Sequence, residues 1–201
     1  MESRTLLVEG AHAFTPRVFP DARGCFVSPF QQTPVAEALG HRLFPVAQTN
    51  HSRSRRGVVR GAHFTLTPPG IAKYVYCARG RARDYVIDIR VGSPTFGQWD
   101  SVVLDDRNFR AMYFPVGVAH AFAALEDDTV MSYMLSGEYV ADNELALSVF
   151  DPDLALELPG DTPLLLSERD TAAPTLRELE SDGRLPRYEE CVKLEHDLYA
   201  G

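Results

Sequence analysis

Short apolar segments recur through the middle of the chain, and turn residues separate them. Four clear examples are residues 85–91, 101–105, 111–116 and 129–135. β-branched and aromatic residues are common in them, which favours strands over helices. Gly, Pro, Asn and Asp fill the connections, as tight turns require. Many short strands in series predict an all-β sandwich or barrel rather than a parallel sheet with crossover helices.

Helix signals are few and lie towards the two ends of the chain. Residues 33–40 offer Thr33 as the N-cap, Pro34 as the first helical residue and Gly40 as the C-terminal stop. Two further helices are expected in the tail, around 174–181 and 187–200.

The length of 201 residues favours one domain. We expect it to have three parts: an N-terminal arm (1–40), a β-barrel core (about 41–155) and a C-terminal helical appendage (about 156–201).

Composition narrows the classes of function. The chain is 45% hydrophobic and 24% charged, as in ordinary globular proteins, and its formal net charge is −8. Binders of nucleic acid or membrane surfaces need a positive field, so neither partner is expected. A small anionic ligand remains compatible with this charge, because a few clustered arginines can hold one locally.

The expected location is the cytoplasm. Residues 1–14 lack the apolar segment of a signal peptide, and no run approaches the ~18 apolar residues of a membrane span. Cys25, Cys77 and Cys191 are odd in number and widely spaced, which predicts reduced thiols.

The segment 60–80 holds His63 and Lys73 in a strand-like apolar run. Strand alternation places His63 and Arg60 on opposite faces. If both line a cavity, the register must slip between them, and Gly61 is where a bulge could form.

A third polar group joins them from a later strand. Lys73 shares a face with Val75 and Cys77, and Tyr133 lies in the strand-like segment 129–135. An imidazole, an ammonium and a phenol could therefore converge inside one barrel and carry acid–base chemistry. The alternative, that each is a satisfied core or rim residue, stays open on spacing alone.

A catalytic metal is not expected. Metal sites in small barrels usually gather several His and carboxylate ligands, often two His one residue apart. Thr65 stands where a second ligand after His63 would lie, and His120 follows a Pro-x-Gly turn without a companion ligand nearby.

Four arginines cluster in residues 53–60 of this acidic chain. We interpret Arg53, Arg55 and Arg56 as members of a solvated turn. Arg60 lies within the apolar run and is the better candidate for binding phosphate.

Six blocks carry a family resemblance: "FPDARGCF", "VAQTNHSRSRRGVVRGAHF", "PPGIAKYVYCARG", "DIRVGSPTFGQW", "FPVGVAHAF" and "FDPDL". In this order they resemble the dTDP-4-dehydrorhamnose 3,5-epimerase family, over roughly residues 15–180. The resemblance is closest to the branch acting on dTDP-4-keto-6-deoxyhexoses in antibiotic deoxysugar pathways. It implies a cupin-type jelly-roll barrel, a homodimer with exchanged edge strands, and no metal or organic cofactor. It also favours C5 as the main position inverted, with C3 as a further one.

The resemblance also implies roles for single residues. His63 matches the catalytic base, Tyr133 the acid on the opposite face of the sugar ring, and Lys73 the lysine near the C4 oxygen. Asp170 matches the aspartate that pairs with the base.

Other matched positions contact substrate. Arg60 and His120 match residues around the sugar and diphosphate. Some of the remaining positions are expected to reach the neighbouring subunit's site: Arg23, Phe26, Gln48, Asn50, Tyr139 and Arg169.

Three positions depart from the family pattern. Ser28 replaces a Glu, Ile71 replaces a Gln, and Thr65 replaces the Gln of "RGLHFQ". They leave the acid–base set intact and alter the wall of the pocket. The alternatives to an epimerase are a metal-dependent cupin enzyme, whose ligand cluster is missing from the sequence, and a non-catalytic sugar-nucleotide-binding barrel.

Overall fold

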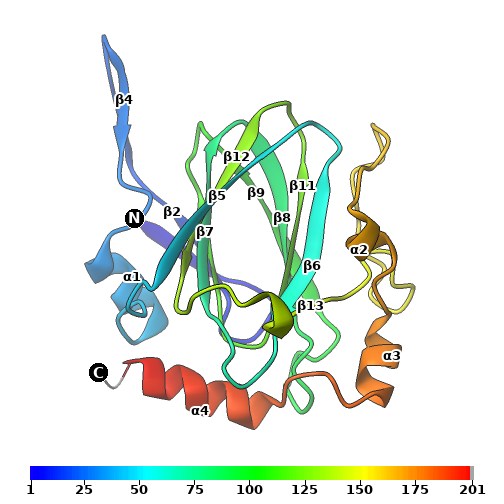
Figure 1. Cartoon of the computed structure of the whole chain (residues 1–201). Coiled ribbons are helices and arrows are strands. Elements are labelled where there is room, and N and C mark those ends of the chain that lie inside the picture. Colours follow the sequence, from blue (N-terminus) through cyan, green and yellow to red (C-terminus); the bar gives the residue numbers. More distant parts are fainter. Residues whose placement is uncertain (200–201) are drawn as a thin grey trace.

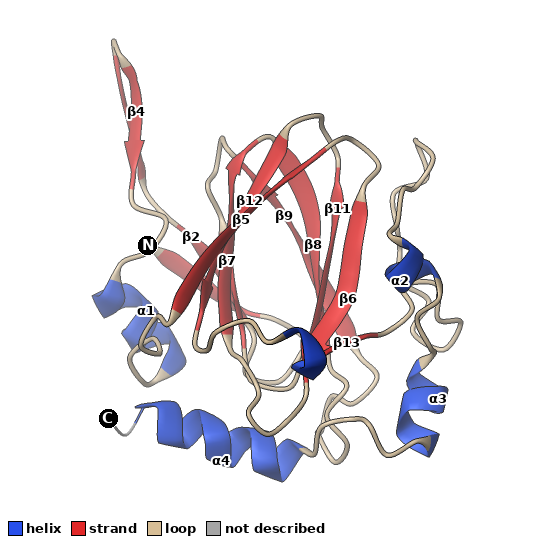
Figure 2. Ribbon diagram, viewed as in Figure 1, coloured by secondary structure: helices blue, strands red, loops and turns tan. Residues whose placement is uncertain are grey.

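Two antiparallel sheets face each other and form a barrel in the computed structural model, which describes residues 1–199 (Figures 1 and 2). Ala200, the last residue of the helix predicted at 187–200, lies outside the described residues. The first sheet has six strands, in the order β1 (Glu2–Thr5), β2 (His12–Thr15), β10 (Ala111–Phe114), β7 (Lys73–Arg79), β12 (Thr129–Leu135) and β5 (Gln48–Ser54).

The second sheet has five strands, in the order β13 (Glu144–Ala146), β6 (Val59–Thr65), β11 (Ala119–Ala124), β8 (Arg81–Ile87) and β9 (Trp99–Asp105). A separate hairpin, β3 (Val18–Asp21) and β4 (Gly24–Val27), projects from the barrel (Figure 1). The helices are α1 (Gln32–Leu39), the 3-10 turn η1 (Ala141–Asn143), α2 (Glu168–Thr171), α3 (Leu176–Ser181) and α4 (Tyr188–Tyr199). None of these helices is long and apolar enough to cross a membrane.

Alternation along the strands divides the apolar side chains into layers. On β8, Ala82 and Val86 point into the barrel, whereas Tyr85 and Ile87 pack outside with residues of the C-terminal segment. A third cluster packs α1 and α4 on the outer face of the six-stranded sheet. The inward-facing side chains form one of these layers, and the cavity described below opens inside the same barrel.

The predicted all-β class with few short helices is confirmed. The segments 101–105, 111–116 and 129–135 correspond to β9, β10 and β12, and the two tail helices correspond to α3 and α4. The segment predicted at 85–91 is β8, which ends earlier, at Ile87. It ends there because Asp88 accepts a hydrogen bond from the Arg90 backbone N–H at 3.0 Å and turns the chain.

The prediction that Thr33 caps α1 is wrong. The helix begins at Gln32, its N-cap is Gln31, and no side chain caps it. Pro34 is the third helical residue rather than the predicted first, and it fits in the first turn because an N–H there has no intrahelical partner to lose. The predicted stop is confirmed, since Gly40 adopts a left-handed conformation with φ of 78°.

The segment predicted as an N-terminal arm contributes to the barrel. β1 and β2 lie within residues 1–40, and β2 pairs with β10. The β3–β4 hairpin is the part of that segment that stands clear of the sheets (Figure 1).

Candidate active site

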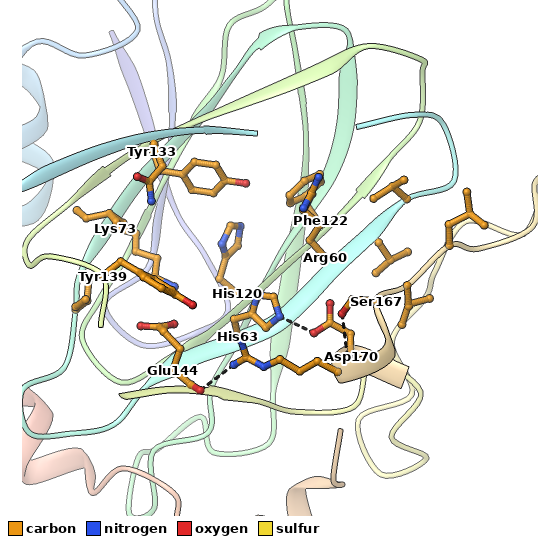
Figure 3. Close-up of a pocket in the computed structure, with 18 of the residues that line it drawn as sticks. Arg60, His63, Lys73, His120, Phe122, Tyr133, Tyr139, Glu144, Ser167 and Asp170 are labelled. Atoms are coloured by element: carbon orange, nitrogen blue, oxygen red, sulfur yellow. Dashed lines mark hydrogen bonds and ion pairs between the residues drawn. The ribbon is translucent and has the colours of Figure 1, made fainter. Parts of the chain in front are cut away.

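A cavity of about 700 Å³ opens between the two sheets. One wall comes from β6 and β11, the other from β7 and β12, and α2 with the preceding loop closes one side (Figure 3). Its volume lies in the range of sites that bury a small organic ligand.

His63 and Asp170 form an imidazole–carboxylate pair on the first wall (Figure 3). His63 Nε2 lies 2.6 Å from Asp170 Oδ1. Asp170 is held at the start of α2, where its backbone N–H donates to Ser167 Oγ at 3.1 Å. The pairing expected from the sequence is therefore present.

The charge of Asp170 fixes the state of His63. Burial raises the pKa of the Asp170 carboxyl, but hydrogen bonds from His63, Gly61 and Ser167 outweigh burial and lower the pKa overall. An ionised Asp170 accepts a hydrogen bond from the Nε2–H of His63, which leaves the lone pair of the neutral ring on Nδ1. That nitrogen is the one free to accept a proton.

A bulge at Gly61 brings Arg60 and His63 to the same cavity. His63 pairs with His120, and Arg60 pairs with Phe122, so three steps on β6 match two on β11. Gly61 has φ of 117°, and a Cβ there would lie 2.5 Å from the His120 carbonyl oxygen. The predicted register slip is confirmed, and its position requires glycine.

Tyr133 and Lys73 occupy the opposite wall (Figure 3). Tyr133 pairs with Val75 across β12 and β7, so Lys73, two residues from Val75, points to the same side. The Tyr133 hydroxyl lies 3.2 Å from Ser52 Oγ. Burial raises the pKa of Tyr133, which keeps the phenol protonated, and burial lowers the pKa of Lys73.

A second imidazole–carboxylate pair lies deeper. His120 Nε2 is 2.6 Å from Asp84 Oδ1, and both side chains are buried. His120 was predicted from the sequence and Asp84 was not, although a carboxylate in an apolar strand was a usable signal. Glu144 was not predicted either; it lines the cavity and accepts a hydrogen bond from Thr65 Oγ1 at 2.6 Å.

The predicted substrate-contacting residues divide into three groups. Those that line the cavity are Asn50, Arg60, His120, Tyr139 and Arg169. Gln48 lies beside this lining, where it donates to Asn50 Oδ1 at 2.7 Å and accepts from the Tyr139 N–H at 2.9 Å. Arg23 and Phe26 lie on the β3–β4 hairpin, away from the cavity of their own chain.

The interpretation of Arg53, Arg55 and Arg56 as exposed members of a turn region is confirmed. All three are exposed, where β5 ends and the turn to β6 begins. Arg53 and Arg56 pair with Asp128 and Asp161. Arg55 in addition reaches the cavity, which it lines together with Arg60.

No group of three or more His, Cys, Asp or Glu side chains suited to a metal ion is found within residues 1–199. The side chain of Lys73 reaches the cavity from the β7–β12 wall (Figure 3).

An imidazole–carboxylate pair opposite a phenol and an ammonium can move protons on a carbon next to a carbonyl group. Fold and site together define a β-barrel isomerase of the acid–base kind. The sequence profile of the dTDP-4-dehydrorhamnose 3,5-epimerase family matches residues 5–178. This chain belongs to that family.

Individual relatives agree along nearly the whole chain. A dTDP-4-dehydrorhamnose 3,5-epimerase of Mycolicibacterium smegmatis is 45% identical over 191 residues, which are 95% of this chain and 94% of the relative. A 4-keto-6-deoxy sugar epimerase from the novobiocin gene cluster of Streptomyces spheroides has a solved structure with a TM-score of 0.91, 45% identity and 95% coverage of both chains. A 3'-monoepimerase from Streptomyces bikiniensis, solved in complex with dTDP-quinovose, has a TM-score of 0.92, 40% identity and 98% coverage of both. The cupin-like jelly roll and the family resemblance are thereby confirmed.

Proposed function

We propose that the enzyme epimerises a dTDP-4-keto-6-deoxyhexose in deoxysugar biosynthesis, with C5 as the main position and C3 as a further one, without a metal or organic cofactor. The observation that carries the proposal is the placement of His63 with Asp170 on one wall and Tyr133 on the other (Figure 3). Inversion at carbon needs a base on one face of the ring and an acid on the opposite face.

The 4-keto group makes this chemistry accessible. Removing the hydrogen from C5 or C3 gives an enolate whose negative charge lies on the C4 oxygen. His63 accepts the proton, and Asp170 stabilises the imidazolium that forms. Lys73 faces the charge that develops on the oxygen, which is the electrostatic contribution expected to be largest. Tyr133 then returns a proton from the other face.

The substrate class is supported by charge as well as by the relatives. A dTDP-sugar carries a diphosphate, and Arg55, Arg60 and Arg169 lie along the cavity in a chain of net charge −8. Guanidinium groups bind phosphate oxygens in bidentate fashion, so these three supply the local positive field that the whole molecule lacks.

We also propose a cytoplasmic homodimer. Phe19 and Phe26 on the β3–β4 hairpin are 49% and 69% exposed, and an interface would bury such side chains. Light scattering should give twice the 22.3 kDa of one chain; the mass of a single chain would contradict the dimer. The free thiols of Cys25, Cys77 and Cys191 suit a reducing compartment.

The experiment that tests the function follows the product. Purified enzyme is incubated with dTDP-4-keto-6-deoxyglucose, the keto sugar is reduced chemically, and the hexoses are identified. We expect epimerised sugars with and without EDTA, none from His63→Ala, and the wild-type amount from His196→Ala, which changes an exposed histidine of α4. Recovery of only the starting configuration from the wild-type enzyme would overturn the proposal.

A further inference from the structure

Asp84 is a buried carboxyl group that the mechanism above does not use. It lies on β8 and is fully buried. Oδ1 accepts a hydrogen bond from His120 Nε2, whereas Oδ2 is buried with no hydrogen-bond partner among residues 1–199. A buried carboxylate oxygen without a partner destabilises the fold, so its presence points to a role outside packing.

The group that needs this charge is Lys73. Within residues 1–199, its ammonium makes no hydrogen bond and no ion pair within 4 Å, and it lines the cavity. Burial lowers the pKa of Lys73, while the carboxylates of Glu144 and Asp84 oppose that shift. A neutral amine would not stabilise an enolate, so catalysis depends on those carboxylates.

The titratable groups that share this cavity or its floor come from several elements. Besides Lys73 itself, the titratable and charged groups are Arg55 before β6, Arg60 and His63 on β6, Asp84 on β8, His120 on β11, Tyr133 on β12, Tyr139 in the following loop, Glu144 on β13, and Arg169 and Asp170 on α2.

Glu144 and Asp84 differ in their surroundings. Glu144 is half-buried on the cavity wall, where it accepts the hydrogen bond from Thr65 and meets whatever fills the cavity. Asp84 lies out of reach of solvent, and burial raises the pKa of its carboxyl while His120 and Lys73 oppose that shift. Its ionised form therefore depends on these two partners, and its charge acts strongly because little water screens it. His120 fixes its position by the 2.6 Å hydrogen bond, and the His120 ring lies 5.9 Å from the ring of Tyr133, on the wall that also carries Lys73. Asp84 is thus shielded from the contents of the cavity, unlike Glu144.

We propose that Asp84 is a positioning residue of this enzyme: its buried carboxylate, held by His120, is the fixed counter-charge that keeps Lys73 an ammonium ion. The inference rests on the proposed role of Lys73 at the C4 oxygen. The same charge favours the protonated form of Tyr133, where it adds to the effect of burial on the pKa of the phenol. One carboxylate therefore supports both the oxyanion stabiliser and the acid.

The sequence makes a direct test practical, because Lys73 and Lys193 are its only lysines. NMR of the full chain labelled at the lysine side chains gives two titrating signals, and Lys193→Arg assigns them. Asp84→Asn keeps the size of the side chain and an acceptor for His120 while it removes the charge. We expect the pKa of Lys73 to fall by about one unit or more, and the basic limb of the kcat/KM profile to move to lower pH with it.

The matched control is Asp153→Asn, which makes the same change of net charge at an exposed residue. It should leave the Lys73 titration unchanged. An unchanged Lys73 titration in Asp84→Asn would overturn the proposal.

A second variant keeps the test decisive if Asp84→Asn does not fold. Glu144→Gln changes a half-buried residue and leaves Asp84 in place. We expect Lys73 to remain an ammonium ion at pH 7 in this variant, and a neutral amine at pH 7 would overturn the proposal. The titration needs no substrate, so its failure leaves the epimerase proposal standing, and missing turnover with the expected titration would count against the epimerase alone.

Discussion

The two imidazole–carboxylate pairs have the same separation but different surroundings. Each Nε2–Oδ1 distance is 2.6 Å, yet the His63 side chain is 32% exposed and that of His120 only 7%. Substrate can therefore reach His63 directly, whereas His120 packs against Phe114 with ring centroids 4.3 Å apart. In our proposals, the same chemical pair serves proton transfer in one place and holds a carboxylate in position in the other.

Among single residues, the Tyr133→Phe variant should separate removal of the proton from its return on the opposite face. The variant keeps the ring but loses the proton that the phenol returns from the second face. We expect epimerisation to fall by about 10²–10⁴-fold, while exchange of the substrate hydrogen with solvent falls much less, because His63 still removes and returns a proton. NMR in deuterium oxide measures both rates, and an equal loss of both would contradict the acid role.

The residues that the family motifs singled out converge on one cavity. His63, Lys73, Tyr133 and Asp170 all line it, although 107 positions separate His63 from Asp170, and their catalytic roles remain predictions. Spacing alone could not have paired Asp170 with His63, because the contact depends on how the tail returns to β6. Asp84 was missed for the same reason, since His120 meets it only through the pairing of β11 with β8.

At the scale of elements, β6 depends on its bulge. Without the slip at Gly61, Arg60 and His63 would point to opposite sides of the sheet. The bulge also directs the Gly61 N–H towards Asp170 Oδ2, at 3.4 Å, so it connects the strand with α2.

Gly61→Ala is expected to damage both stability and activity. An alanine at φ of 117° is strained, and its Cβ would clash with the His120 carbonyl. We expect a loss of about 1–3 kcal/mol in the free energy of unfolding and a fall in kcat/KM of at least roughly tenfold through displacement of His63. Denaturant titration and kinetics measure these effects. Gly160→Ala, at an open position, is the control; a Gly61→Ala variant as stable and active as that control would refute the role of the bulge.

The turn after β8 is held by a buried ion pair. Asp88 accepts hydrogen bonds from the Arg90 guanidinium at 2.8 and 2.9 Å and from the Ser93 and Thr95 hydroxyls at 2.6 Å. Arg90 also donates to the Glu9 carbonyl oxygen, which joins this turn to the loop after β1.

Asp88→Asn should destabilise the protein by about 3–5 kcal/mol near neutral pH, because it leaves Arg90 buried without its counter-charge. Burial raises the pKa of Asp88, but the contacts with Arg90, Ser93 and Thr95 outweigh it and lower the pKa below 3.8. The stabilisation is thus present above the unfolded-state pKa and is lost as the pH falls through the lower folded pKa. Urea titrations at pH 7 and below pH 4 should show the gap between variant and wild type narrowing in acid. A gap that is absent at pH 7 would contradict this account.

Pattern reasoning succeeded for the strands because short apolar runs rich in β-branched and aromatic residues, bounded by turn residues, are a local signal. It failed at Thr33, where the N-cap is Gln31, two residues earlier, and no side chain caps the helix, and at 88–91, where a side-chain network ends the strand. Neither feature leaves a periodic signal.

For the whole molecule, a net charge of −8 coexists with a substrate that is itself anionic. The chain resolves this conflict by concentrating arginines along one cavity. We could predict the jelly roll from the family motifs but not from the composition, since many β-barrels share this composition.

Arg60→Ala is expected to weaken the binding of dTDP by roughly tenfold or more, as the loss of a charged hydrogen bond does. Calorimetry at fixed ionic strength measures it. Arg53→Ala, which removes an exposed arginine paired with Asp128, is the control and should bind dTDP as the wild type does. Equal affinities of the two variants would remove Arg60 from the phosphate site.

The most direct test of the central claim is NMR of dTDP-4-keto-6-deoxyglucose with the wild-type enzyme in deuterium oxide, with and without EDTA. Acid–base catalysis from facing walls predicts deuterium at C5, and also at C3 if both centres are inverted, at rates that EDTA does not change. An absence of deuterium at both carbons would contradict it.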